Sequence, residues 1–507
     1  MFAKVKTCCL IGIEGFLIDI EIDISNGIPA FEIVGLGDIT VKESKERVKA
    51  AIKNSNLEFP IKKITINLSP ANIRKIGALF DLGISCAILL VCGIIKRDIS
   101  KWIIIGELSL DGKVKDINGI LPIVACCKEL GYKNIIVPFD NLYEAKIVKG
   151  VNIIAVKTLN ETVNFFNGEC EDIKINGENI NKNIFYQNSY YDVDMSDVKG
   201  QNVAKRVLEI SAAGNHSILM IGSPGSGKTM LSKRLPTILP DMTYEEVIEV
   251  TKIYSIMGLT SKDIPIVKNR PFRDPHHTIS CTSLVGGGTY PKPGELSLAT
   301  KGVLFLDEFP EFKKETLEAL RQPLEEGIVN INRLAGNVKY PADVLLVCAA
   351  NPCKCGYYID EKRECICSAY QIGNYLNKIS GALSDRIDLK IEIPQVNYED
   401  IYSDVKEENS LSIKKRVNKA RQIQLKRFEN IKIKTNSQLS HKLLNVYCSL
   451  DKNCKNIMRM VFEKYSLSAR AHDKIIKIAR TIADLEESEE INEKHIAESI
   501  QYRCNNV

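Results

Sequence analysis

The sequence predicts an α/β protein of three parts: an N-terminal α+β domain with a mixed sheet, a central α/β domain with a parallel sheet, and a C-terminal helical domain. Strand-like and helical segments alternate as far as residue 165. A strand, a glycine-rich loop and a helix then follow one another over 217–239, and further apolar strand-like runs come later. After Pro394 the pattern becomes helical, with no strand-like stretch of note.

Two changes in composition set the expected boundaries. Residues 167–195 are polar and rich in Asn, without a helical or strand period, which is typical of a linker. A softer boundary lies near Pro394. We therefore expect an N-terminal domain at 1–166, a central domain at 196–394 and a helical domain at 395–507, which suits a 507-residue chain at roughly 150 residues per domain.

Composition favours an enzyme of the cytoplasm. The 45% hydrophobic and 26% charged content is ordinary for soluble proteins, and a net charge of +5 permits contact with nucleic acid without requiring it. Most of the 16 cysteines stand singly in apolar runs, as reduced core residues do. The apolar run 88–95 is too short to cross a membrane, and we expect no membrane contact.

The N-terminal domain contains recognisable elements in order. We expect strands at 63–70 and 134–138, helices at 80–95 and 120–131, and two short strands around a turn at 103–114.

The loop at 222–229 reads GSPGSGKT and fits G-x-x-x-x-G-K-[ST] without a mismatch. Its backbone N–H groups can surround a phosphate chain, Lys228 can reach the β and γ oxygens, and the Thr229 hydroxyl can ligate Mg²⁺. The alternative is a chance glycine-rich turn. We expect ATP and Mg²⁺ to bind here, at Gly222, Ser223, Pro224, Gly225, Ser226, Gly227, Lys228 and Thr229.

Two later strands are expected to deliver polar groups to the same site. VLFLDE ends in Asp307, which would hold Mg²⁺ through its water shell, and Glu308, which would polarise the attacking water. DVLLVCAAN ends in Asn351, whose amide can orient that water. A solvated acidic turn is the alternative interpretation of the carboxylates, but hydrolysis of ATP is the better hypothesis.

Four cysteines fall in the loop 353–367 with the pattern C-x-C-x₉-C-x-C. Glycine and charged residues around them indicate an exposed loop, and four thiolates can close a tetrahedral shell around Zn²⁺. Free thiols or a redox-sensing pair are the alternatives. The candidate zinc ligands are Cys353, Cys355, Cys365 and Cys367.

Two other features bear on nucleic acid. The run 413–434 carries nine cations against the single Glu429, and it forms either a solvated helix or a non-specific phosphate-binding surface. His276 and His277 either face a threaded strand, together with the glycine run 285–288, or are satisfied by local backbone. The nine cations are Lys414, Lys415, Arg416, Lys419, Arg421, Lys426, Arg427, Lys432 and Lys434.

The run GELSLDGKVKDINGILPIVACCKELGYKNIIVP resembles the proteolytic domain of the Lon family, which uses a Ser–Lys dyad. By that match Leu121 stands where the lysine belongs, and no serine lies between Lys75 and Gly83. The resemblance therefore implies a Lon-like fold that is inactive as a peptidase.

Four phrases resemble the YifB/ComM family of magnesium-chelatase-like AAA+ ATPases, and together they cover nearly the whole chain. They are GIPAFEIVGLGDITVKESKERVKAAIKNS, DVKGQNVAKRVLEISAAGNHSILMIGSPGSGKTML, FRDPHHTISCTSLVGGGTYPKPGELSLATKGVLFLDEFPEF and SLSARAHDKIIKIARTIADLE. Departures from the family pattern are Gly37, Thr300, Ala382 and Ser384. Thr300 puts in doubt an essential role for a side chain at its position.

The resemblance implies a ring of subunits, with six expected. Arg386, in ISGALSDRIDL, would act as an arginine finger on the neighbour's ATP, unless it forms a structural ion pair with Asp385 or Asp388. Arg470 would reach the γ-phosphate within its own subunit, with a plain surface arginine as the alternative. The implied function is a hexameric DNA helicase or branch-migration factor that acts on recombination intermediates, as in natural transformation. A chelatase-type ATPase that remodels a protein partner is the second hypothesis, and an ATP-dependent protease is a weak third.

Overall fold

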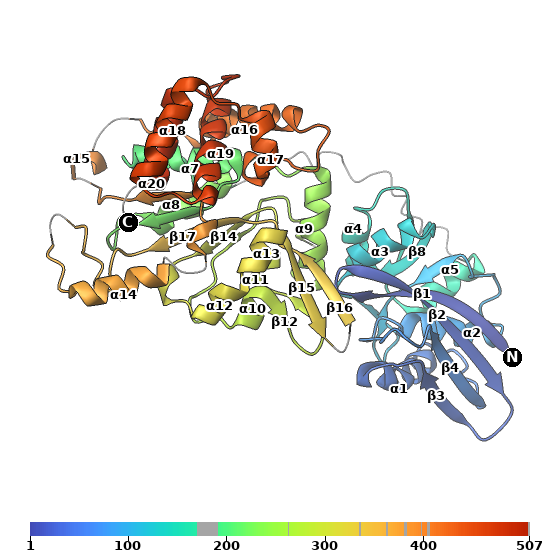
Figure 1. Ribbon diagram of the computed structural model, residues 1–507. Helices are drawn as coiled ribbons and strands as arrows, with labels where there is room; N and C mark the ends of the chain where they lie inside the picture. The colour runs from blue at the N-terminus through green and yellow to red at the C-terminus, as the bar shows by residue number, and fades with distance from the viewer. Residues whose placement is uncertain are drawn as a thin grey trace.

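The structure is a computed structural model of the chain and describes residues 1–169, 191–261, 263–333, 336–360, 363–379, 383–396, 398–402 and 406–504. Most of the expected linker, residues 170–190, and the family departure Ala382 lie outside the described residues. Figure 1 shows three bodies: the N-terminal domain in blue and cyan, the central sheet in green to orange, and the helical domain in red.

The N-terminal domain is a mixed seven-stranded sheet in the order β3-β4-β2-β1-β5-β8-β9. Alternate strand residues point to opposite faces, so the sheet has two cores, one under α1 and α2 and the other under α3. The elements are β1 (Phe2–Ile11), β2 (Glu14–Ser25), β3 (Ala30–Val34), α1 (Ile39–Asn54), β4 (Lys63–Ser69), α2 (Asp81–Val91), β5 (Trp102–Ile104), α3 (Ile120–Glu129), β8 (Asn134–Pro138), α4 (Leu142–Ala145), β9 (Asn152–Val156) and α5 (Leu159–Asn167). The two short strands expected around a turn are β6 (Glu107–Leu108) and β7 (Val114–Lys115).

The central domain has a parallel five-stranded sheet in the order β11-β14-β17-β10-β18, with apolar cores on both faces. Its strands are β10 (Ile218–Ile221), β11 (Phe272–Arg273), β14 (Val303–Leu306), β17 (Leu345–Ala350) and β18 (Leu389–Glu392). Ile221 is level with Ala350 on one side and with Glu392 on the other. The carboxyl ends of these strands therefore meet at one edge of the sheet, where ligands bind in open α/β sheets.

Helices and small hairpins surround that sheet. The helices are α7 (Asn202–Gly214), α8 (Lys228–Ile238), α9 (Tyr244–Ile256), α10 (Cys281–Val285), α11 (Glu295–Leu298), α12 (Lys314–Ala319), α13 (Arg321–Glu326), α14 (Ala369–Ile379) and α15 (Tyr398–Ile401). The hairpins are β12 (Gly286–Gly287) with β13 (Lys292–Pro293), and β15 (Ile328–Arg333) with β16 (Gly336–Pro341).

The helical domain packs α16 and α19 against each other and against α7 of the central domain. Its helices are α16 (Ser410–Arg427), α17 (His441–Tyr447), α18 (Lys452–Lys464), α19 (Ala469–Leu485) and α20 (Glu493–Cys504). Among the described residues, no helix is both long and apolar enough to cross a membrane.

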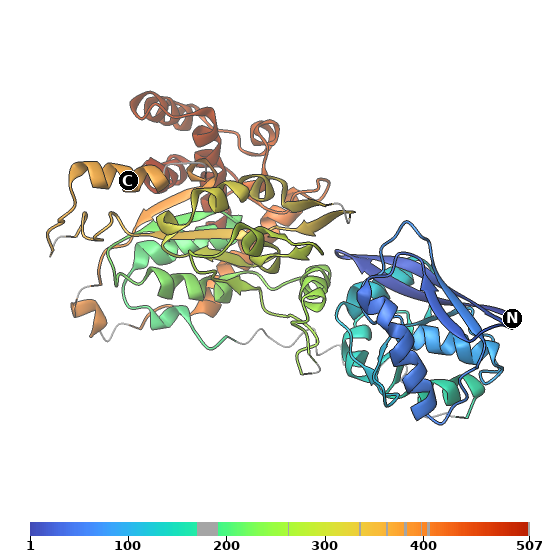
Figure 2. The same ribbon diagram turned by 90° about the horizontal axis from the view of Figure 1, so that it is seen from below.

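Helix α9 joins the N-terminal domain to the central domain (Figure 2). Val247 of α9 and the nearby Ile266 belong to the same core as α3. The Tyr244 hydroxyl donates to the Ile147 carbonyl at 3.0 Å, and the Thr260 hydroxyl donates to a Glu144 carboxylate oxygen at 3.1 Å. This shared apolar core fixes the N-terminal domain against the central domain through a helix.

Candidate ATP-hydrolysis site

The phosphate-binding loop connects β10 to α8, as its sequence predicts. Gly225 and Gly227 adopt φ values of +81° and +91°, which side chains with a Cβ rarely adopt. A Cβ on Gly222 would lie 2.5 Å from the Ile393 carbonyl oxygen, so the backbone there has no room for a side chain. The glycines therefore set both the curvature of the loop and its approach to β18.

Lys228, Thr229, Asp307 and Asn351 come together at the carboxyl edge of the sheet. The Lys228 Nζ donates to the carbonyls of Gly222 (2.7 Å) and Ser223 (3.0 Å) and to Asn351 Oδ1 (3.3 Å). The Thr229 hydroxyl donates to Asp307 Oδ2 at 2.7 Å. A hydroxyl and a carboxylate this close can share one Mg²⁺, directly or through water.

A bound polyphosphate would favour the charged form of Lys228, which burial disfavours. Burial lowers the pKa of Lys228, and the charge of Asp307 partly offsets this. The chemistry of the donor set therefore fits Mg²⁺-ATP: Lys228 and the loop amides would hold the phosphates, and Thr229 and Asp307 would hold the metal. Bound Mg²⁺ would supply charge neutralisation at the γ-phosphoryl group.

Glu308 follows Asp307 in a strained backbone conformation. Its φ is +49°, in the left-handed region that non-glycine residues avoid, and such strain often occurs at functional sites. The Glu308 side chain is about half exposed, and its Oε2 lies 3.0 Å from His277 Nδ1. A carboxylate at this position can accept a proton from water, and the imidazole holds its orientation.

His277 therefore lies beside the candidate water-activating carboxylate, a contact that neither sequence hypothesis foresaw. The two histidines were expected either to face a threaded strand or to be satisfied by local backbone. His276 agrees with the local alternative: the Thr278 backbone N–H donates to its Nδ1 at 3.4 Å, and the Thr278 hydroxyl lies 2.9 Å from the same atom. The His277 ring lies 4.1 Å from that of His276 and faces Glu308, and contact with a threaded strand stays a prediction. The glycine run contains β12, and the nearby Tyr290 hydroxyl accepts a hydrogen bond from Arg74 of the N-terminal domain.

Asp274 is a site residue that sequence reasoning missed. It follows β11, the strand next to β14. Burial and the neighbouring charge of Asp307 both raise the pKa of Asp274. Asp274 therefore lies on the Asp307 side of the candidate site, where a nearby cation would favour its charged form. The signal available in the sequence was an aspartate directly after a short strand in DPHH.

Arg386 lies at the opposite edge of the sheet from the phosphate-binding loop. It ends a turn of 3₁₀-helix (Ser384–Arg386) just before β18, whereas the loop begins level with the last residue of β18. Its guanidinium pairs with Glu325 rather than with Asp385 or Asp388, the partners considered from sequence. Asp388 instead contacts Lys474 (3.0 Å) and His216 (3.1 Å). Arg386 therefore cannot serve the ATP of its own subunit.

The predicted role of Arg470 is not compatible with its position in the structure. It is exposed in the first turn of α19, and Lys474, one turn later, donates to the Ile387 carbonyl at 3.1 Å. Further along, the Thr481 hydroxyl lies 2.8 Å from His216 Nε2. Helix α19 thus runs along the amino-terminal edge of β10 and β18. The expectation that Arg470 reaches the γ-phosphate in its own subunit does not fit this placement, because α19 packs at the far edge of the sheet.

The four cysteines of the loop 353–367 come together. All four sulfur atoms lie within 4.8 Å of one another, with 3.3 Å from Cys353 to Cys355 and 3.6 Å from Cys353 to Cys365. A tetrahedral site with Zn–S bonds of about 2.3 Å places its sulfurs about 3.8 Å apart. Hydrogen bonding, first from the Tyr357 backbone, lowers the pKa of Cys355 to about 6. The geometry fits a Zn²⁺ shell.

The basic run 413–434 is mostly engaged within the chain. Lys414 pairs with Asp241, Arg416 with Glu209 and Glu408, Lys419 with Glu487, Arg421 with the Ala212 and Ala213 carbonyls, and Arg427 with Asp484. Lys415, Lys426, Lys432 and Lys434 are exposed. This distribution indicates that the helix has a structural role in joining the two domains. It does not indicate a continuous phosphate-binding surface.

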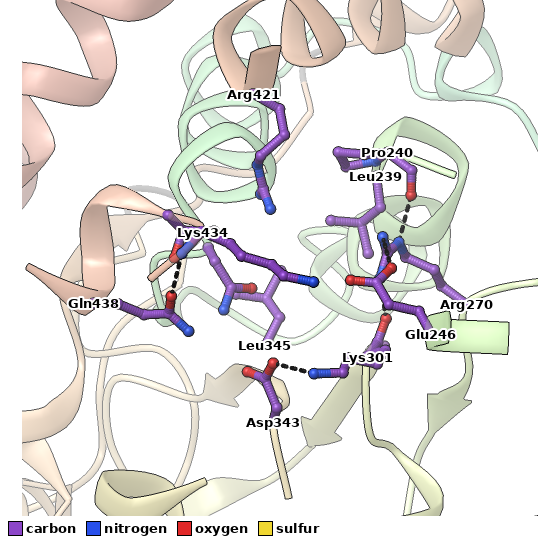
Figure 3. A pocket seen from close by; sticks show the side chains of 13 residues that line it. Leu239, Pro240, Glu246, Arg270, Lys301, Asp343, Leu345, Arg421, Lys434 and Gln438 are labelled. Atoms are coloured by element: carbon purple, nitrogen blue, oxygen red, sulfur yellow. Dashed lines mark hydrogen bonds and ion pairs between the residues drawn. The ribbon is translucent and has the colours of Figure 1, made fainter. Parts of the chain in front are cut away.

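Arg421 and Lys434 enter a small cavity between the central and helical domains (Figure 3). Arg270, Lys301, Glu246 and Asp343 line it from the central domain. Glu246 pairs with Arg270 at 3.0 Å, and Asp343 pairs with Lys301 at 2.7 Å. Lys301 and Asp343 precede β14 and β17, so this cavity is at the edge of the sheet away from the phosphate-binding loop and is separate from the ATP site.

Comparison with known proteins identifies the family of this chain. The family model described as "Magnesium chelatase, subunit ChlI" matches residues 194–401, "Subunit ChlI of Mg-chelatase" matches 20–141, and "Magnesium chelatase, subunit ChlI C-terminal" matches 407–503. The competence protein ComM of Haemophilus influenzae is 38% identical over 97% of this chain and 96% of its own length. YifB of Escherichia coli is 38% identical over 99% of this chain and 96% of its own length. The chain belongs to the YifB/ComM family of magnesium-chelatase-like AAA+ proteins.

More distant similarity agrees with this assignment. Lon protease 2 of Bacillus subtilis is 29% identical over 30% of this chain and 30% of its own length. An MCM-type protein of Methanocaldococcus jannaschii is 27% identical over 27% of this chain and 15% of its own length.

In this member of the family, Leu121 is fully buried in α3. Thr300 is also buried and donates to the Pro341 carbonyl at 2.9 Å, a structural role.

Proposed function

We propose that the protein is an ATP-driven ring motor, a homo-hexamer that acts as a helicase or branch-migration factor on single-stranded or branched DNA in recombination. The observation that carries the ring is the position of Arg386. The ATP site has a P-loop, a metal-binding pair and a water-activating carboxylate, but Arg386 and Arg470 lie at the opposite edge of the sheet. Another subunit therefore completes the site.

Support for DNA comes from relatives. A competence protein aligns over nearly the full chain, and an MCM-type protein aligns over part of it. Within the chain, the exposed lysines of the run 413–434 and the hairpin β12–β13 are the candidate contacts with phosphates and bases.

The second candidate is a motor that remodels a protein partner, as the chelatase family descriptions suggest. Four of the nine cations in the run 413–434 pair with carboxylates of the same chain, which leaves less positive charge for DNA at that surface. In neither case do we expect peptidase activity, because a buried leucine replaces the dyad's lysine.

ATP hydrolysis by the full chain, measured with and without forked DNA, distinguishes the two. Stimulation by DNA that weakens steeply with added salt supports the DNA motor. The Lys228→Ala variant provides the background rate. Hydrolysis by the wild type that is equal with and without DNA at low salt would contradict the DNA motor and favour the protein-remodelling candidate.

We also propose that the cysteine loop holds one structural Zn²⁺ per chain, through Cys353, Cys355, Cys365 and Cys367. The support is the set of sulfur distances, which already lie near those of a tetrahedral shell. Elemental analysis of reduced protein, purified without a metal-affinity tag, is expected to find about one zinc per chain.

A further inference from the structure

The cysteine loop is built directly against the phosphate-binding loop. Gly356, one residue after the ligand Cys355, adopts φ +90°, and its N–H donates to the Cys353 carbonyl at 3.0 Å. A Cβ on Gly356 would lie 2.7 Å from both Cγ and Cδ of Pro224. There is therefore no space for a side chain between the metal shell and the third residue of the phosphate-binding loop.

A second connection runs through the strand β17. Asn351 follows its last residue, accepts a hydrogen bond from the Lys228 Nζ and precedes the ligand Cys353 by two residues. Cys353 is fully buried, and the Tyr375 phenol of α14 contacts the Asn351 backbone. The phosphate-binding loop thus touches the cysteine loop at Pro224 and again through Lys228.

The loop 353–367 is held by a few polar contacts, among them the Gln395 amide donating to Asp360 at 2.6 Å and Arg363 stacked on the Tyr357 ring. Its described residues form no helix or strand, and its other three cysteines are partly exposed. A short loop of this kind buries too little apolar surface to offset the entropy of ordering it, so a bound metal supplies the order.

We infer that Zn²⁺ in this loop fixes the wall of the ATP site, so that metal occupancy sets the affinity for ATP. The inference rests on the proposed zinc site. Binding forms four Zn–S bonds and releases the thiol protons to solvent, and no electron transfer is involved. When the metal leaves, Pro224 loses its packing surface and Asn351 loses the constraint on the partner of Lys228.

Two substitutions in the full-length protein separate metal binding from its effect. Cys365→Ser removes a ligand that is distant in sequence from Pro224, and Gly356→Val keeps all four ligands but places a side chain against Pro224. Cys92→Ser is the matched control, since Cys92 is an exposed cysteine of the N-terminal domain. Zinc content is measured by elemental analysis and the Kd for Mg²⁺-ATP by calorimetry.

The expected results differ for each variant. Cys365→Ser loses zinc and binds ATP about tenfold more weakly, which is the low end of the effect that changes beside a metal site have on activity. Gly356→Val retains zinc and is also weakened, whereas Cys92→Ser matches the wild type in both measurements. Wild-type protein stripped by a chelator loses affinity for ATP and regains it when Zn²⁺ is restored, which excludes misfolding of a variant as the cause.

Two results would overturn the coupling while leaving the zinc site intact: zinc-free protein that binds ATP as tightly as the wild type, or Gly356→Val with unchanged affinity. The proposed zinc site itself fails if reduced wild-type protein neither contains nor takes up zinc. That outcome is distinguishable because it appears in the elemental analysis before any ATP is added.

Discussion

The Arg386→Ala substitution is the strongest test of the proposed ring, because the proposed role of Arg386 links ATP hydrolysis in one subunit to the neighbouring subunit. From Leu389 to Glu392, β18 spans three residue steps, about 10 Å at 3.3 Å per step, and Arg386 lies still further back. An arginine finger contributes roughly 10³–10⁵ in rate, or about 4–7 kcal/mol of the activation barrier. We expect the variant to bind ATP normally and to hydrolyse it more slowly, by a factor that approaches roughly 10³–10⁵.

Loss of the ion pair between Arg386 and Glu325 is not expected to unfold the chain, and the free energy of unfolding of the variant is measured to check this. The partner of Arg386, Glu325, is about half exposed, and ion pairs with an exposed partner contribute about 0–1 kcal/mol. The Ser217 hydroxyl binds the Arg386 carbonyl at 2.8 Å, a contact that the substitution preserves. Arg386→Lys is the matched control: it keeps the charge but not the planar fork, and it should remain slow.

Mixed rings decide whether Arg386 acts between subunits. Arg386→Ala subunits keep a sound phosphate-binding loop, and Lys228→Ala subunits keep a sound Arg386. Mixing them should restore part of the turnover, because some interfaces then contain both intact groups. If crosslinking shows that mixed rings form and activity stays flat at every ratio, Arg386 does not act on a neighbour.

Three further predictions concern single side chains. Glu308→Gln should bind ATP and retain it, with turnover lowered roughly 10²–10⁴-fold in single-turnover assays, and a wild-type rate would remove Glu308 as the base. His277→Ala should lower kcat about tenfold without changing the Kd for ATP, since it holds Glu308 in orientation, whereas a change in Kd alone would point to a structural role. Asp388→Asn should cost about 2–3 kcal/mol in denaturant unfolding at pH 7, because it leaves the charge of Lys474 without its carboxylate. Burial works against ionisation of Asp388, but Lys474 first and then His216 outweigh it and hold its pKa below the usual value. This stabilisation is therefore present above about pH 4 and lost as the pH falls further, and equal acid sensitivity in wild type and variant would contradict it.

The phosphate-binding loop and the strands that carry Asp307 and Asn351 were predictable because their chemistry is local. Glycines at fixed spacing impose a backbone shape, and polar residues directly after parallel strands must meet at one edge of the sheet. The four cysteines were predictable for the same reason, since their ligands lie within one short loop. The first strand pair, β1 and β2, was missed, although β2 carried a signal: isoleucines alternate with charged residues from Ile18 to Ile24, the period of a half-buried strand.

Contacts between distant segments had to come from the tertiary structure. His277 and Asp274 reach the site because β11 pairs with β14, a pairing that composition does not encode. The cations of α16 looked free in sequence because their carboxylates, such as Asp241 and Glu487, belong to other elements. Likewise, the sequence at the start of α19 predicts a helix that carries an arginine. The packing of the helical domain decides which edge of the sheet this helix covers. A motif fixes the chemistry that a segment can perform, whereas packing over long sequence separations decides which partner it meets.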